Sequence, residues 1–92
     1  MSVYLIVTGN PKDPEKLAKY SQSAGPTMAA AGAKMVAKGK PTALTGEPSP
    51  LAAIFTFPDR AAVEAWYASA DYQALVDLRE QAMDTTFMVL ET

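Results

Sequence analysis

The sequence predicts an α+β domain whose elements follow the order strand, helix, strand, strand, helix, strand. Two observations predict it. Short runs of β-branched and aromatic residues alternate with segments in which apolar residues recur every three or four positions. Proline, glycine and helix-capping residues stand at the boundaries between these segments. With 92 residues and no cysteine, the chain is expected to form one domain, residues 1–92, without disulfides.

The first strand is expected over residues 2–8, and the Gly-Asn-Pro triplet at residues 9–11 is expected to end it. A helix is then predicted to begin, because Asp13 is a favoured N-cap residue and Pro14 a favoured first helical residue. The apolar residues that recur at helical spacing, and are therefore expected to face the sheet, are Leu17, Tyr20 and Ala24.

The Gly25-Pro26 pair is expected to break or kink this helix, because proline lacks an N–H and its ring meets the preceding turn. A second short helical piece over residues 27–31 is expected to stop at Gly32. A second strand is predicted over residues 34–37.

This second strand is expected to continue over residues 42–45, beyond a turn at residues 38–41. Residues 46–50 contain glycine and two prolines and predict a loop. The run Leu-Ala-Ala-Ile-Phe-Thr-Phe at residues 51–57 is the clearest strand of the chain.

Pro58 ends this strand, and Asp59 is expected to cap the next helix, with a buried stripe of Val63, Trp66 and Tyr67. Ser69 is expected to cap a further helix that runs to about Met83, so the second helical region is split in two. The last strand is expected over residues 85–90. This order is the split βαβ pattern of ferredoxin-like domains, which have a four-stranded antiparallel sheet.

Both faces of the predicted strands are apolar. In the first strand Val3 and Leu5 occupy one face while Tyr4 and Ile6 occupy the other, and the last two strands follow the same pattern. Helices of this topology cover one face only, so the other needs a cover. A homodimer through the sheet face supplies that cover, whereas the alternative is a monomer with a moderately apolar open face.

Composition argues against several partners and chemistries. The formal net charge of −2 and the isolated lysines give no basic stripe, so nucleic acid is not expected as a partner. The short apolar run at residues 3–7 is unlike a membrane span or a signal peptide, which favours a cytoplasmic protein without membrane association. Without histidine or cysteine, Ser-His and Cys-His nucleophiles and the usual zinc and haem sites are excluded, and no cofactor or metal is expected.

Arg79 is the most informative polar residue, because it shares one side of a predicted helix with Tyr72 and Leu75. One interpretation is structural: a salt bridge with Asp71, Asp84 or Glu91, or packing under a tyrosine ring. The other is an anion clamp for a small ligand in a pocket between sheet and helices. The candidate ligand-binding residues are Arg79, Tyr20, Tyr72, Trp66 and Phe55.

The segment from Trp66 to Arg79 resembles a known signature. It holds an aromatic pair, a serine, a Tyr-Gln pair, a leucine and an arginine, at the spacings found in the domain of unknown function 1330 family. That family is biochemically uncharacterised and belongs to the dimeric α+β barrel group. The resemblance therefore implies a ferredoxin-like chain that pairs sheet against sheet. Further matching residues are Asp13-Pro14-Glu15, Tyr20, Gly32 and Phe57-Pro58.

This chain departs from the family pattern at two places. It has Gly32-Ala33-Lys34 where relatives often have two glycines and an arginine, and Thr56 where they often have a glutamate. Three functions remain open. The first is a homodimer that binds a small, partly apolar anionic metabolite. The second is a cofactor-free monooxygenase- or isomerase-like enzyme for small cyclic compounds, with Asp71 or Asp84 as base. The third is a structural or interaction dimer.

Overall fold

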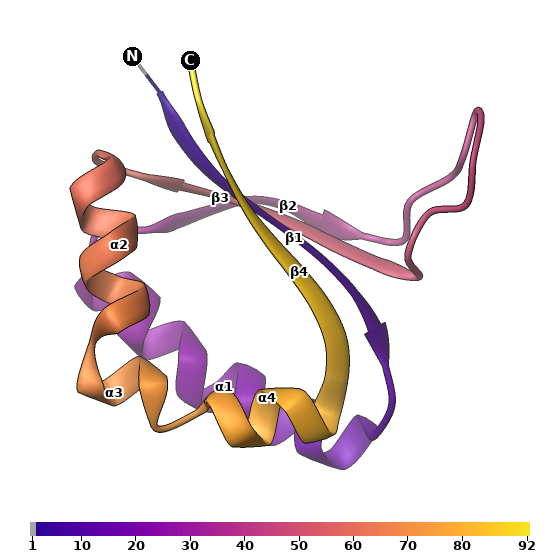
Figure 1. The fold of residues 1–92 in the computed structure, drawn as a ribbon, viewed down its shortest axis with the longest axis horizontal. Helices are drawn as coiled ribbons and strands as arrows, with labels where there is room; N and C mark the ends of the chain where they lie inside the picture. Colours follow the sequence, from indigo (N-terminus) through magenta and orange to yellow (C-terminus); the bar gives the residue numbers. More distant parts are fainter. Residues whose placement is uncertain (1) are drawn as a thin grey trace.

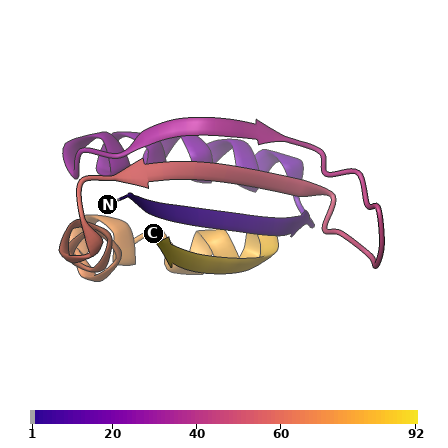
Figure 2. The same ribbon diagram turned by 90° about the horizontal axis from the view of Figure 1, so that it is seen from above.

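A four-stranded antiparallel sheet with helices on one of its faces makes up the structure, a computed structural model that describes residues 2–92 (Figure 1). The first residue of the predicted 1–92 domain lies outside the described residues. The strand order across the sheet is β2-β3-β1-β4, and in Figure 2 α1 and α4 lie behind the strands while α2 is seen end-on at their left. The predicted α+β class, the element order and the ferredoxin-like topology are confirmed. The elements are β1 (Val3–Pro11), α1 (Pro14–Ala30), β2 (Lys34–Gly39), β3 (Leu51–Phe57), α2 (Arg60–Ala68), α3 (Ala70–Gln73), α4 (Val76–Ala82) and β4 (Met83–Glu91).

Local capping signals mark the helix ends as predicted. Asp13 accepts hydrogen bonds from the backbone N–H groups of Glu15 and Lys16, and Pro14 occupies the first position of α1. At the other end of α1, the N–H of Gly32 bonds the carbonyl of Ala29 and the N–H of Ala33 bonds that of Met28. This is a Schellman motif, and Gly32 adopts the positive φ of 83° that it requires. Asp59 and Ser69 cap α2 and α3 in the same way as Asp13.

Of the break or kink predicted at Gly25-Pro26, the break is wrong, as is the separate helical piece over residues 27–31, because α1 continues through Pro26 to Ala30. Gly25 precedes the proline and has no Cβ with which the proline ring could collide. The hydroxyl of Thr27 donates to the carbonyl of Ala24 at 2.6 Å, a local polar bond that accompanies the proline within the helix. One proline therefore remains inside a helix that gains its stability from a buried face.

Three other boundaries differ from the prediction. β1 extends through residues 9–11, because those residues pair with the start of β4 at Thr85, Asp84 and Met83. Residues 42–45 form no strand; β2 ends at Gly39 and residues 40–50 form an arm that projects from the sheet, with Leu44 fully exposed (Figure 1). The helix expected from Ser69 to Met83 is interrupted at residues 74–75 and becomes α3 and α4.

Alternate side chains of β1, β3 and β4 face the helices and form the core, whereas every residue of β2 is exposed. Leu5 lies between Phe55 and Val89 in the sheet register, and the rings of Trp66 and Tyr72 cover this face from α2 and α3. Tyr67, predicted to be buried with Val63 and Trp66, is instead 38% exposed. The buried core residues are Val3, Leu5, Tyr20, Ala24, Phe57, Val63, Trp66, Tyr72, Ala82 and Met83.

On the opposite face of the sheet, the described part of the chain places no helix (Figure 2). Ile6 lies at its centre, in register with Ile54 on β3 and Met88 on β4. Next to it Tyr4 is in register with Leu90, and both Met88 and Leu90 are exposed. The prediction of two-sided apolar strands is therefore confirmed. None of the helices in residues 2–92 has the length and apolar character needed to cross a membrane.

Candidate functional site

A cavity of about 170 Å³ lies between α1 and the sheet. α1 contributes Tyr20, β3 contributes Phe55 and α2 contributes Trp66, so three of the five predicted site residues line one space. The remaining two, Arg79 and Tyr72, do not line it. The other lining residues are Leu5, Val7, Gly9, Leu17, Ser21, Ala24, Gly25, Met28, Met35, Lys38, Leu51, Ala53, Met83 and Phe87.

A second cavity, of about 340 Å³ and more open to solvent, lies between α2 and β4. Tyr67 and Glu64 line it from the helix, and Val89 lines it from the strand. The two cavities have three lining residues in common: Leu5, Trp66 and Phe87.

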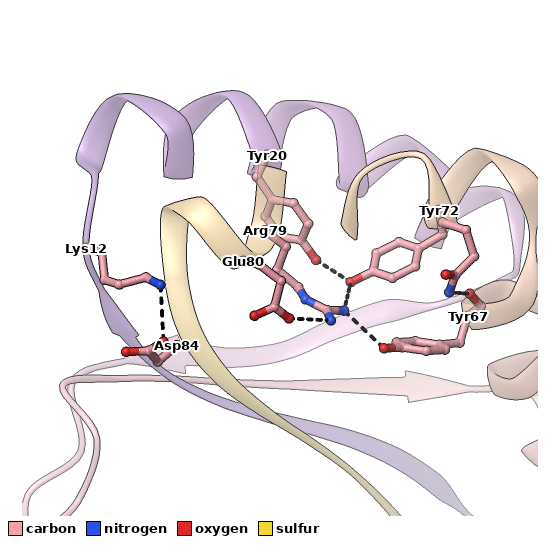
Figure 3. Close-up of polar contacts among 8 residues, drawn as sticks. Lys12, Tyr20, Tyr67, Tyr72, Arg79, Glu80 and Asp84 are labelled. Atoms are coloured by element: carbon pink, nitrogen blue, oxygen red, sulfur yellow. Dashed lines mark hydrogen bonds and ion pairs between the residues drawn. The ribbon is translucent and has the colours of Figure 1, made fainter. Parts of the chain in front are cut away.

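Arg79 is a buried arginine with hydrogen-bond donors to spare. It lies on α4, is 7% exposed, and its Nη1 donates to the hydroxyls of Tyr72 at 3.0 Å and Tyr67 at 3.2 Å (Figure 3). Its Nη2 donates to Glu80 at 3.0 Å, and its Nε has no hydrogen-bond partner among residues 2–92. Burial lowers the pKa of Arg79, but the bonds to Tyr67, Tyr72 and Glu80 outweigh it and raise that pKa above the usual range. The guanidinium therefore stays charged.

A second polar contact joins this arginine to the first cavity. The hydroxyls of Tyr20 and Tyr72 lie 2.6 Å apart, so Tyr20, whose ring lines the cavity, is connected to Arg79 through Tyr72. Burial raises the pKa of Tyr20 and of Tyr72 above the usual value; for Tyr72 the bonds from Tyr20 and Arg79 only partly oppose this. Both phenols are therefore neutral near pH 7.

The cluster has more protons to donate than oxygens to accept them. An arginine donates five N–H groups and accepts none. The contact between Tyr20 and Tyr72 holds only one of their two hydroxyl protons, so the other has no acceptor among residues 2–92. The carboxylate that contacts Arg79 belongs to Glu80, whose side chain is 59% exposed. An arrangement with excess donors and a buried positive charge is suited to an anion or a carbonyl-like acceptor.

The ion pairs considered for Arg79 with Asp71, Asp84 or Glu91 are not formed. Asp84 belongs to β4, where it alternates onto the open face of the sheet, and it pairs with Lys12 at 3.2 Å (Figure 3). Glu91 pairs with Arg60 at 2.7 Å. The alternative of tyrosine packing is present, because the Arg79 guanidinium lies 5.7 Å from the Tyr67 ring centroid and 5.9 Å from that of Tyr72.

The carboxylates considered as a catalytic base do not reach either cavity. Asp71 and Asp84 are exposed and line neither space. Within residues 2–92 there is also no group of three or more carboxylates that could hold a metal ion. The enzyme hypothesis with either aspartate as base therefore has no structural support.

Three residues of the cluster were missed from the sequence. Phe87 lies 4.9 Å from the Arg79 guanidinium, closer than either tyrosine ring, and Tyr67 and Glu80 bond it directly. From the sequence, Phe87 was placed with Val89 on one face of the last strand, and Tyr67 was assigned to a buried helix stripe and considered, with Tyr20 and Tyr72, as a hydroxyl donor in a pocket wall. That both contact Arg79 depends on how α2, α4 and β4 are placed relative to one another, which the sequence alone does not give.

Comparison with known proteins relates this arrangement to uncharacterised relatives. The profile of the family described as "Domain of unknown function (DUF1330)" matches residues 2–92. A protein of unknown function from Rhodopseudomonas palustris is similar in structure, with a TM-score of 0.83 and 22% identity over 99% of this chain and 82% of that chain. A dimeric ferredoxin-like protein of unknown function from Thermobifida fusca has a TM-score of 0.67 and 14% identity, over 100% of this chain and 92% of that one.

A DABB family protein with a ferredoxin-like fold from Mesorhizobium loti has a TM-score of 0.73 and 13% identity, over 99% of this chain and 96% of that chain. At these identities the structural likeness establishes the fold. No curated protein matches the chain.

Proposed function

The chain belongs to the DUF1330 family, and we propose that it binds a small, partly apolar anionic metabolite between its sheet and its helices. The observation that carries this proposal is the buried Arg79, whose Nε lacks a partner among residues 2–92 and whose hydroxyl contacts lead to a cavity wall at Tyr20. A buried guanidinium is costly unless its donors are paired, so the free donor favours a ligand that carries an acceptor.

The size of the first cavity favours a ligand with about one ring. An apolar protein cavity of about 150 Å³ accommodates benzene, and the cavity beside α1 measures about 170 Å³. Phe55 and Trp66 provide aromatic surface for such a ring, and Tyr20 joins the cavity wall to the hydroxyl network. A monocyclic acid or enol fits this combination of apolar walls and excess donors.

Benzoate and its neutral counterpart benzamide test this proposal directly. Wild-type protein is expected to bind benzoate more tightly than benzamide in calorimetric titrations. Arg79→Met removes the charge while keeping an apolar stem, and it is expected to weaken benzoate binding about 10- to 100-fold, the usual range for a hydrogen bond to a charged group. Arg79→Lys, which retains the charge, should lose less. Equal benzoate affinity in wild type and Arg79→Met would refute the arginine's role.

We also propose that two copies of the chain associate through the open face of the sheet. Support comes from the uncovered apolar residues around Ile6, Ile54 and Met88, and from similar ferredoxin-like proteins that are described as dimeric. Light scattering at micromolar concentration is expected to give the mass of two chains, and Ile54→Lys to give that of one. A wild-type protein that remains a single chain would contradict the dimer.

A further inference from the structure

Three side chains separate the two cavities from one another. Leu5 of β1, Trp66 of α2 and Phe87 of β4 line both spaces. The rings of Trp66 and Phe87 are parallel within 4°, with their centroids 6.5 Å apart. The space between sheet and helices is therefore one cleft, which runs from α1 towards the β4 edge and is interrupted by this partition.

Phe87 also covers the arginine. Its ring centroid lies 4.9 Å from the guanidinium carbon of Arg79, and Arg79 lines neither cavity although Phe87 lines both. The ring thus stands between the positive charge and the cleft. A cation over an aromatic face is attracted to it, so the covered state is stable without a ligand.

Phe87 is the least buried member of the partition. Leu5 is 2% exposed at the centre of the sheet. Trp66 is also buried, and its Nε1 donates to the hydroxyl of Thr27 at 2.9 Å. Phe87 is only partly buried, stands on an edge strand and has no polar atom to anchor it. A change in its side-chain rotamer alters the partition without moving the backbone.

We propose that Phe87 is a gate over Arg79, which rests on the ligand-binding function proposed above. When the ring turns, the two cavities join and the guanidinium with its unpartnered Nε faces the joined cleft. A carboxylate or enolate oxygen then replaces the aromatic face as the arginine's neighbour, and the apolar part of the ligand occupies the joined space. The ring limits the binding of acids in particular, because an acid must displace it to pair with Arg79, whereas a neutral ligand gains nothing from the cation and leaves the gate closed.

The gate predicts a link between charge selectivity and residue 87 that titration can measure. The probes are 2-naphthoate, which is a two-ring acid, and its neutral counterpart 2-naphthamide. Phe87→Ala is expected to raise the preference for the acid over the amide by about tenfold, because the cover over the arginine is gone. Phe87→Leu, which keeps more of the core volume, should change the preference in the same direction. Arg79→Met in the Phe87→Ala protein should abolish this increase in the preference for the acid.

Val89→Ala is the matched control. Val89 lies on the same strand and the same face as Phe87 and lines the second cavity, but it has no contact with the arginine of the kind that Phe87 makes. Its substitution enlarges that cavity and should leave the acid-to-amide ratio unchanged.

The outcomes separate the gate from the underlying function. If Phe87→Ala raises the affinity for the acid and for the amide equally, the ring only fills space. The gate proposal is then wrong, while the proposal of anion binding at Arg79 stands. The gate is also wrong if the ratio rises as much in Val89→Ala, or if the gain survives Arg79→Met. If neither wild type nor the opened variants bind benzoate or 2-naphthoate, the ligand-binding function itself fails.

Discussion

Tyr72→Phe removes one oxygen from the centre of the buried cluster and should destabilise the protein strongly. Tyr72 has no exposed surface. Its hydroxyl accepts a hydrogen bond from Arg79 at 3.0 Å and forms a second hydrogen bond with the hydroxyl of Tyr20 at 2.6 Å. The phenylalanine ring occupies the same volume, so the apolar contacts are kept and the change isolates the hydroxyl.

The magnitude follows from the two contacts. A neutral hydrogen bond contributes about 1 kcal/mol and one to a charged group about 1.5–3 kcal/mol, and their former partners remain buried. The free energy of unfolding should therefore fall by about 3 kcal/mol. For a domain of this size each kcal/mol corresponds to roughly 4–8 °C, so the melting temperature should fall by about 12–24 °C.

Tyr67→Phe provides the comparison, because it removes another hydroxyl from the same arginine. Tyr67 is 38% exposed and its hydroxyl lies 3.2 Å from Nη1, so water replaces the lost bond and the cost should stay below about 1 kcal/mol. Urea unfolding of both variants at one fixed protein concentration measures the difference. If Tyr72→Phe loses less than 1 kcal/mol, or if Tyr67→Phe loses as much, the cluster does not stabilise the fold as described.

Two further predictions test the fold and the buried phenols. Gly32→Ala should lower the free energy of unfolding in urea by about 1–2 kcal/mol, because Gly32 has a φ of +83° and an added Cβ would stand 3.0 Å from the ring of Pro58. Gly39→Ala, where an added Cβ meets nothing within 4 Å, should be nearly neutral. Equal losses of stability in the two variants would contradict the backbone strain at Gly32. Burial raises the pKa of Tyr20 and Tyr72 above the ordinary 10, so above about pH 10 the unfolded chain releases protons that the folded chain keeps. The stability that these phenols contribute is thus complete below pH 10 and is lost as the pH rises further. The free energy of unfolding measured from pH 8 to 11.5 should show this loss, and Tyr20→Phe should make the loss smaller. If the free energy falls with pH equally in wild type and Tyr20→Phe, the burial of Tyr20 does not raise its pKa as described.

Signals carried by one or two neighbouring residues predicted the fold well. Asp13-Pro14, Gly32 and Asp59 each act on the backbone within a few positions, so their roles follow from the residue type. Pro26 was misjudged because the general cost of a helical proline is offset by the glycine before it and by packing of the buried helix face. The strand expected at residues 42–45 failed because no neighbouring strand pairs with those residues.

The candidate site was only partly predictable for a related reason. Tyr20, Phe55 and Trp66 were identified as apolar residues facing inward, which periodicity indicates, and the structure brings them to one cavity. The contact of Arg79 with Tyr72, which helical spacing predicted, is formed. Glu80 is the residue next to Arg79, which helical spacing does not place on the same face, and Phe87 belongs to β4, so periodicity could not identify either as its neighbour.

The pairing of β1 with β4 has a consequence for the order in which the molecule assembles. Residues 3–11 lie in register with residues 83–91 along their whole length, so the first strand of the chain meets one of its two neighbours only after nearly all the remaining residues have been synthesised. Pairings between such distant segments form slowly, because a long loop must close, at a cost in chain entropy, before any hydrogen bond between the strands can offset that cost. During translation one edge of β1 therefore stays without a paired strand until β4 has been made. A nascent chain halted before Met83 should be a preferred substrate for chaperones that recognise extended apolar segments.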